Sequence, residues 1–510
     1  MRPHAVLLAV LALTTACRRP PEVVVERSLA VDEAAYAPIT GDSPLATDFF
    51  FVPKSQAQLD TYLATGPVDR PVRLIVVESA INVEGAGDLD SAVSLAKAYI
   101  DAAEPGLRTL LDGHDHLVFT VVKTPLWLSS SSNGAPLPAD PGWTMAHTAP
   151  PGDLDVWAQL VRETVTHLDS KIGDEVELSF EIWNEPDLYW SGTEEELLAL
   201  YATTAGAIRE AVPDAKIGGF GSNQWDGRVS GSEGPVLDAL VERAERDDLP
   251  LDFVAFHAFV DHPFALDTAT DGVQAILAAH GRQDTPVWVT EWNNTSAVRG
   301  SAFQPASFAT LSTRFRERGL DMRFCATWAD YSERRDGSGY GLLDHDAEDK
   351  PVARVHRRLL QLHGTQAQLV RDDEISAWIA QDGDCRNVLI WRDLPPPDVA
   401  ALLVLTEELT ADDLAEHYTE LTALLADIRN GSPPVSAWQE VFDRARDALV
   451  SREAELTTVA DVTLDLGVEG GVVRAIRMDE AREDDLVVDV TEGLVVRLDA
   501  NAVGWLEVCP

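Results

Sequence analysis

The sequence predicts an α/β protein, a (β/α)8 TIM barrel followed by a C-terminal β-sandwich that carries a helical hairpin. From about residue 45 to 365, apolar runs of strand character alternate with helical patterns, which is typical of a parallel barrel. From about 366 to 510, short β-type runs follow one another instead. Within that second region, at about 410–455, two helical stripes flank Asn430-Gly431, residues that commonly end a helix.

The predicted barrel strands are mostly apolar, as expected for a parallel sheet that is covered on both faces. Thr193 and Glu196 form a capping box at the start of one intervening helix. The expected strands are 49–52, 72–77, 117–122, 176–182, 216–220, 253–257, 287–290 and 322–328. The expected helices are 55–63, 89–103, 154–168, 194–211, 235–246, 272–280, 306–318 and 352–362.

The C-terminal region is expected to form a sandwich, which residues 23–25 could join as a further strand. The first hairpin helix covers about 411–429, and the second begins at Ser436, with Gln439 completing a capping box. The apolar stripe of the second helix could dock on the barrel, which we favour, or form a lid. That stripe consists of Trp438, Phe442, Ala445 and Leu449. The expected strands are 377–380, 387–391, 457–464, 472–476, 486–490, 493–498 and 504–508.

The N-terminus has the pattern of a signal peptide. An apolar run over 5–13 is too short to span a bilayer, and Cys17 follows small residues, as at a bacterial lipoprotein cleavage site. The alternative is cleavage after Ala16 by an ordinary signal peptidase. We therefore expect an exported protein, anchored in the cell envelope by a lipid on Cys17 or otherwise secreted. The expected segments are the signal peptide 1–17, a linker 18–44, the barrel 45–365 and the sandwich domain 366–510.

Composition limits the partners. The 510 residues carry a formal net charge of −45, with a sequence pI of about 4.4, so we expect no binding of nucleic acid and membrane contact only through Cys17. Cys385 and Cys509 both lie in the C-terminal region, where an exported protein could join them. Cys325 lies in an apolar strand and is expected to be a buried thiol.

Two stretches place a carboxylate at the end of an apolar strand. Glu185 follows the run 176–182, and Pro186 stops the ladder because proline has no N–H to donate. Glu291 ends a second such strand. These are the fourth and seventh predicted strands, and barrel active sites sit at the carboxyl ends of strands, so both carboxylates face one mouth. Hydrolysis of a glycosidic bond uses such a pair, and Asn184 can donate a hydrogen bond to the sugar 2-hydroxyl.

A metal site is not expected. His114-Asp115-His116 has a spacing found in zinc sites, but it precedes the strand 117–122 and so lies at the opposite end of the barrel from the mouth. No Gly-rich phosphate loop and no Ser-His-Asp order stands out. We therefore expect neither a metal nor another cofactor.

Several short segments together match the pattern of a known enzyme family. They are Trp183-Asn184-Glu185-Pro186-Asp187-Leu188, Phe256-His257-Ala258-Phe259, Thr290-Glu291-Trp292-Asn293, Trp328, and Gly341-Leu342-Leu343 followed by Lys350-Pro351. In these segments the chain resembles the clan A glycoside hydrolases, and within them family 39, which holds β-xylosidases and α-L-iduronidases. The resemblance extends over the barrel and the sandwich.

The resemblance implies a retaining double displacement with Glu185 as acid/base and Glu291 as nucleophile. It places His257 near the nucleophile, with a packed strand-end histidine as the alternative, and Trp328 in the aromatic wall of the sugar pocket. Two further residues are candidates for substrate binding. These are Asn293, in the second carboxylate motif, and Trp127, which either lines the same cleft or packs in the core.

Two departures from the family concern specificity. Phe259 stands where the family usually has Tyr, and Val77-Glu78-Ser79 stands where the xylosidases carry His-Gly. Both spare the catalytic carboxylates but put xylose specificity in question. The sequence thus predicts an exo-acting, β-xylosidase-like hydrolase of oligo- or polysaccharides. The alternative is a non-catalytic surface protein that binds carbohydrate on a degenerate barrel.

Overall fold

A computed structural model of the chain describes most of the protein, including nearly all of the barrel. The described residues are 23–38 except 33, 46–48, 71–137, 144–330 except 297 and 321, 339–406 except 345, 347, 363 and 364, 408, 409, 413, 417, 421–466, 471–478, 484–489 and 494–510. Cys17, the predicted strand 49–52 and the predicted helix 55–63 lie outside them, as does most of 411–420.

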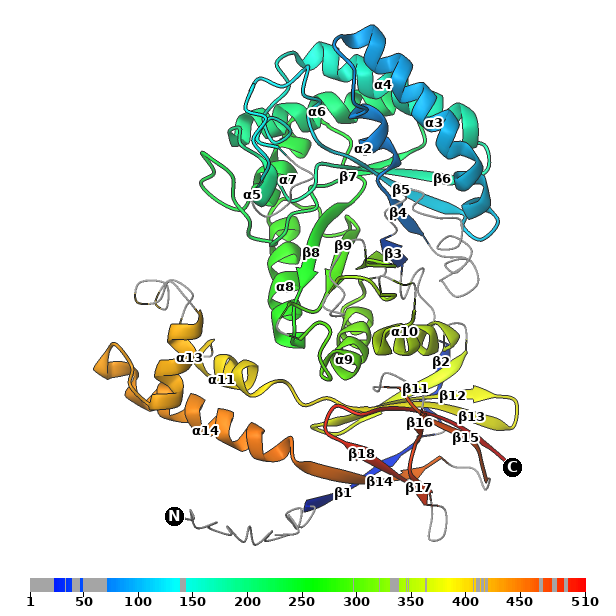
Figure 1. Cartoon of the computed structure of the whole chain (residues 1–510), viewed down its shortest axis with the longest axis vertical. Coiled ribbons are helices and arrows are strands. Elements are labelled where there is room, and N and C mark those ends of the chain that lie inside the picture. Colours follow the sequence, from blue (N-terminus) through cyan, green and yellow to red (C-terminus); the bar gives the residue numbers. More distant parts are fainter. Residues whose placement is uncertain are drawn as a thin grey trace, which may run out of the picture.

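Eight parallel strands form the barrel, in the order β7-β6-β5-β4-β3-β10-β9-β8 (Figure 1). A parallel bridge between Gly218 and Phe253 joins the two ends of this sheet. The strands are β3 (Ala46–Asp48), β4 (Val72–Leu74), β5 (His116–Val121), β6 (Glu177–Ile182), β7 (Lys216–Gly218), β8 (Val254–Phe259), β9 (Val287–Asn293) and β10 (Met322–Ala326). Consecutive strands pair in the order a TIM barrel requires, with Ala46–Asp48 as the described first strand.

Helices follow the strands and pack on the outside of the sheet (Figure 1). They are α2 (Val76–Ile81), α3 (Leu89–Leu111), α4 (Leu154–Ile172), α5 (Pro186–Tyr189), α6 (Glu194–Ala211), α7 (Val236–Asp247), α8 (Pro263–Ala279), α9 (Gln304–Glu317) and α10 (Pro351–Gln361). The capping box of Thr193 and Glu196 is present at the start of α6. Apart from the four-residue α5, each of these helices buries apolar residues in a core that it shares with the strands.

Several expected boundaries in the barrel were wrong. The helix expected over 89–103 continues to Leu111, and the strand expected over 287–290 continues to Asn293. The strand predicted over 72–77 ends at Leu74, because Val76 and Val77 begin α2 with both side chains buried. A short valine run that is buried all round does not distinguish a strand from a helix. The helix predicted from 272 begins at Pro263 instead, where the His262 side chain accepts the Phe264 N–H and proline suits the first turn.

The C-terminal region contains two sheets that enclose a common apolar core. Their orders are β1-β14-β18-β17 and β16-β15-β19-β13-β12-β11-β2. Residues 23–25 do pair there, because β1 (Val23–Ala30) runs parallel to β14 (Thr458–Asp465). Leu29, Val462 and Leu506 meet in the shared core. The remaining strands are β2 (Ala37–Pro38), β11 (Gln366–Arg371), β12 (Ile375–Asp382), β13 (Cys385–Arg392), β15 (Gly471–Arg477), β16 (Asp484–Asp485), β17 (Val488–Asp489), β18 (Leu494–Asp499) and β19 (Val503–Cys509).

The larger C-terminal sheet packs against the barrel helix α9. Trp391 on β13 donates its indole N–H to the Thr310 hydroxyl at 2.9 Å, and Trp378 on β12 donates to Thr313 at 3.1 Å. A disulfide joins Cys385 to Cys509, on the neighbouring strands β13 and β19, with the Cα atoms 4.3 Å apart. The C-terminal strand is thereby attached covalently to the sheet that supports the barrel.

The helical insertion has a core of its own, and here the expected docking on the barrel was wrong. The stripe on α14 (Gln439–Glu455) packs against α11 (Pro397–Thr406), a helix that the sequence analysis did not predict, and α13 (Leu421–Asn430). The capping box expected at Ser436 is also absent, because Ser436–Trp438 form a 3-10 turn before α14. None of the described helices is both long and apolar enough to cross a membrane.

Candidate active site

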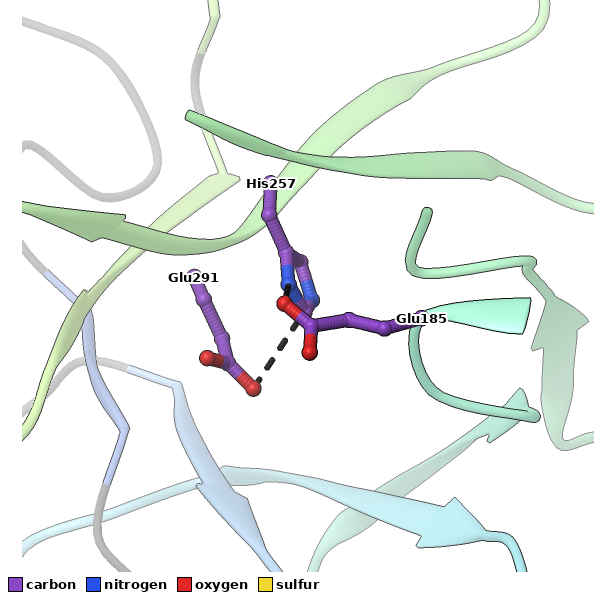
Figure 2. A group of neighbouring side chains, drawn as sticks. All are labelled: Glu185, His257 and Glu291. Atoms are coloured by element: carbon purple, nitrogen blue, oxygen red, sulfur yellow. Dashed lines mark hydrogen bonds and ion pairs between the residues drawn. The ribbon is translucent and has the colours of Figure 1, made fainter. Parts of the chain in front are cut away.

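Glu185, His257 and Glu291 converge at the carboxyl ends of β6, β8 and β9 (Figure 2). One carboxylate oxygen of each glutamate and one ring nitrogen of the histidine all lie within 4.8 Å of one another. Glu185 is the residue before Pro186, and its backbone is left-handed, with φ of 46°. This turn ends the strand and directs the carboxyl group into the mouth instead of along the outside of the barrel.

His257 lies between the two carboxylates (Figure 2). Its Nδ1 hydrogen bonds with Glu185 Oε1 at 2.8 Å, and its Nε2 lies 3.7 Å from Glu291 Oε1. Burial alone would lower the pKa of His257, but the Glu291 and Glu185 carboxylates outweigh it and raise this pKa to about 9. His257 is therefore protonated at neutral pH and donates to Glu185.

Burial raises the pKa of Glu185 above its ordinary value. The charge of Glu291 adds to this rise, whereas the hydrogen bond with His257 acts in the opposite direction. A raised pKa suits a general acid, because the carboxyl group then holds its proton to higher pH.

Arg73 on β4 connects the nucleophile candidate to the other polar groups. Its guanidinium donates to Glu291 Oε1 at 2.9 Å, to Glu181 Oε2 at 2.7 Å and to Asn184 Oδ1 at 2.7 Å. The Arg73 side chain is 1% exposed, so these charge-assisted bonds are made with little competition from water. They fix the orientation of the Glu291 carboxylate.

The loop after β7 supports both Glu185 and His257 through its backbone. The Gly221 carbonyl accepts the Glu185 N–H at 2.6 Å, and the Ser222 carbonyl accepts the His257 N–H at 2.7 Å. The Asp187 carboxylate, two residues after Glu185, accepts the N–H groups of the next two loop residues, Asn223 and Gln224. The acid/base candidate and its histidine partner are therefore held by one loop.

Charge balance accounts for the two raised pKa values. The cluster contains three carboxylates, those of Glu181, Glu185 and Glu291, but one guanidinium, that of Arg73, which donates to Glu181 and Glu291. A proton on Glu185 and a second one on His257 bring the cluster to neutrality, which a buried site favours. The three groups of Figure 2 also form a possible metal-ligand set, but Arg73 already occupies Glu291 Oε1 with a positive charge.

The other predicted site residues have different surroundings. Asn184 belongs to the cluster through Arg73. Asn293 is buried, donates to the carbonyls of Ala326 and Tyr340, and accepts from Gln304, so its amide holds neighbouring backbone in place. Its role in substrate binding stays a prediction.

Both tryptophans that were expected to contact sugar pack against the barrel core. Trp127 is half-buried beside this core. Trp328 is 1% exposed and lies edge-on to His356 of α10, with ring centroids 6.3 Å apart. Their contacts with a sugar also stay predictions. Glu78, at the departure from the family pattern, pairs with Lys123 at 2.7 Å.

Sequence reasoning missed Arg73 and Glu181. Each is a charged residue within an apolar strand run, where an ionised side chain is costly unless it is paired. That signal was readable, but only the closed barrel shows that the two are partners across β4 and β6. His116, from the rejected metal motif, hydrogen bonds with Ser179 at 2.7 Å near the start of its strand.

The sequence around this site matches a described family. Residues 142–382 match the sequence model of the glycosyl hydrolases family 39. A β-xylosidase from Caldicellulosiruptor saccharolyticus is 26% identical over 255 residues, which are 44% of this chain and 50% of that protein. Over this region the chain is similar to the family 39 glycoside hydrolases. It spans about half the length of this curated relative, and the matched family region includes Glu185, His257 and Glu291 but not Arg73.

Solved structures agree on the fold. The glucosidase from Croceicoccus marinus superposes with a TM-score of 0.61 at 18% identity, covering 95% of this chain and 99% of that one. A monomeric β-xylosidase from Caulobacter crescentus CB15 gives a TM-score of 0.59 at 17% identity, with 95% and 99% covered. At this level of identity the likeness establishes a shared fold with these two enzymes and no more.

Proposed function

We propose that the protein is a retaining glycoside hydrolase with Glu185 as acid/base and Glu291 as nucleophile. The observation that carries this proposal is the approach of their carboxylate oxygens to within 4.8 Å. Retaining enzymes hold their two carboxyl groups ~5–5.5 Å apart, whereas inverting enzymes need ~6.5–9.5 Å to admit a water molecule. The short separation supports direct attack by Glu291 on the sugar.

In the first step Glu291 attacks the anomeric carbon while Glu185 gives its proton to the departing glycosidic oxygen. The C–O bond to the leaving group breaks, and an ester between Glu291 and the sugar forms. Glu185 gains a negative charge as Glu291 loses one, so the net charge of the buried cluster does not change. Arg73 and His257 therefore face the same total charge before and after the step.

In the second step Glu185 acts as a base. The charge of Glu291, which raises the pKa of Glu185, is absent from the ester, so Glu185 now holds a proton less strongly. It removes a proton from water, the water oxygen attacks the anomeric carbon, and the ester bond breaks to restore Glu291. The sugar is released with its original anomeric configuration.

For substrate and location, the proposal is an exo-acting β-xylosidase-like enzyme of the bacterial cell envelope. The 26% identical β-xylosidase supports the substrate class. The Cys385–Cys509 disulfide supports export, because such bonds persist in oxidising compartments. A lipid on Cys17 would supply the anchor. Because Phe259 and Glu78 depart from the family pattern, the substrate panel below includes sugars other than xylose.

The test is hydrolysis of aryl β-xylosides, glucosides, galactosides, fucosides, α-arabinosides and α-iduronides by the wild type and Glu291→Ala. We expect turnover of one of these substrates, its loss in the variant, and rescue of the variant by azide as a small replacement nucleophile. Turnover should fall at high pH as Glu185 loses its proton. No turnover by the folded wild type would favour an endo-acting enzyme or a carbohydrate-binding protein.

A further inference from the structure

Two buried polar atoms below the catalytic pair lack hydrogen-bond partners among the described residues. They are Glu181 Oε1 and His257 Nε2, the latter 3.7 Å from Glu291 Oε1 and so beyond hydrogen-bond distance of it. Glu181 uses its other oxygen on Arg73, and His257 uses Nδ1 on Glu185. A protonated imidazole donates from both nitrogens, and a carboxylate oxygen needs a donor. Leaving either group unsatisfied in a buried site would be costly.

Both of these atoms lie beside Gly221. A Cβ atom added to Gly221 would lie 2.6 Å from Glu181 Oε1 and 3.0 Å from His257 Nε2. The two atoms therefore lie no farther apart than the sum of those distances, and no direct hydrogen bond joins them. One water molecule spans such a separation, accepting from Nε2–H and donating to Oε1.

The surroundings can give this water a third partner. Thr120 pairs with Glu181 in the parallel register of β5 and β6, so both side chains lie on the same face of the sheet. Its Oγ1 is buried and likewise has no partner among the described residues. Buried waters typically make about three hydrogen bonds, so the donors and acceptors here suffice.

We propose that one water molecule is bound between Glu181 and His257 beside Gly221, and that through it Glu181 is a positioning residue for His257. The water fixes the imidazole plane from the Nε2 side, and Glu185 fixes it from the Nδ1 side. His257 then presents its Nδ1–H to Glu185 in one orientation. The catalytic part of this inference rests on the proposed glycosidase function, whereas the water site itself does not.

The site can be tested by crystal structures of the wild type and of Gly221→Ala at a resolution that resolves single waters. The methyl group that Gly221→Ala adds would meet the Glu181 carboxylate at a distance shorter than real contacts, so Glu181 and the water must move. Gly206→Ala in α6 is the matched control, because nothing lies within 4 Å of its added Cβ. We expect the water in the wild type and in the control, and its loss or displacement in Gly221→Ala.

The positioning role is tested by kinetics and by NMR titration of His257. Misplacement of a catalytic group by about 1 Å costs roughly 10²-fold in rate, so we expect a loss of that order in Gly221→Ala but not in Gly206→Ala. Glu181→Gln keeps the side-chain volume and removes the charge. Glu181→Gln should therefore lower the pKa of His257. The fall of turnover at high pH should also begin at a lower pH than in the wild type.

The proposal is overturned if the wild-type density holds no water there, or if Glu181 contacts His257 directly. It is equally overturned if Gly221→Ala keeps the kinetics of the control, or if Glu181→Gln leaves the His257 titration unchanged. If the protein hydrolyses no glycoside, the crystallographic and NMR results still decide the water and the role of Glu181. A failure of the proposed function is thereby separated from a failure of this inference.

Discussion

Arg73 and His257 together contact all three carboxylates at the barrel mouth. Arg73 donates to Glu181 and Glu291, and His257 donates to Glu185. Both cations are buried, so their hydrogen bonds are strong and the loss of either leaves uncompensated charge. The charge state of these few residues therefore affects the stability of the site and, in the proposed mechanism, its catalysis.

Replacing His257 by Asn should make stability less dependent on pH. The folded pKa of about 9 exceeds the ordinary value of 6.5, so the contribution of His257 is complete below about pH 6.5 and is lost as pH rises through about 9. The advantage of the wild type in free energy of unfolding should therefore shrink by roughly 3 kcal/mol between about pH 6 and about pH 10. Urea unfolding across this range measures it, and a constant difference would contradict the charge assignment.

Replacing Arg73 by Lys should lower both stability and turnover. Lysine keeps the charge, but it cannot reach Glu181, Asn184 and Glu291 together as the planar guanidinium does. We expect a loss of roughly 1–3 kcal/mol in the free energy of unfolding, because buried acceptors are left without donors. Arg246→Lys, at an exposed position, is the control. Equal losses of stability in the two variants would argue that the contacts of the Arg73 guanidinium with Glu181, Asn184 and Glu291 contribute little.

At the level of elements, the capping box of α6 offers a test of local sequence signals. The Thr193 hydroxyl accepts the Glu196 N–H at 3.3 Å, and the Glu196 carboxylate accepts the Thr193 N–H at 2.7 Å. Thr193→Ala should destabilise the protein by about 1 kcal/mol. Thr268→Ala, at an exposed position within α8, should change stability less. Thermal unfolding of the two variants compares them, and a cap variant as stable as Thr268→Ala would show that the box contributes little.

Elements with strong local signals were predictable, and those with ambiguous apolar runs were not. The range of α6 was predicted correctly because its start carries a capping box and its apolar residues have helical spacing. In contrast, α2 continues a valine run, and α11 is an apolar decapeptide without a polar face. Periodicity does not assign such segments, so tertiary packing decides them. Packing on α11 also explains why the α14 stripe does not dock on the barrel.

For the whole molecule, the site combines residues that the chain order keeps far apart. Arg73, Glu181, His257 and Glu291 come from β4, β6, β8 and β9. The two catalytic candidates could be predicted because each lies near the carboxyl end of an apolar strand, and Pro186 marks the first such end. The roles of Arg73, Glu181 and Gly221 could not be predicted, because they depend on the separation of neighbouring strands in the closed barrel.

The disulfide also constrains a large part of the chain, because it joins two cysteines with a sequence separation of 124. Removing it should lower the free energy of unfolding of the two-sheet region by about 4 kcal/mol, since the unfolded chain gains freedom. Calorimetry of the Cys385→Ser/Cys509→Ser double variant, and of the wild type with and without reductant, checks this. Reductant should not affect the double variant. An unchanged unfolding temperature in the reduced wild type would contradict the expectation.

The most direct test of the central claim is covalent trapping of the nucleophile. A 2-fluoro glycoside of the preferred sugar, with a good leaving group, slows the second step and lets the glycosyl ester accumulate. Digestion and mass spectrometry then locate the sugar in the sequence. The retaining mechanism predicts one sugar per protein, attached to Glu291. A sugar attached to any other residue, or turnover with inversion of the anomeric configuration, would contradict it.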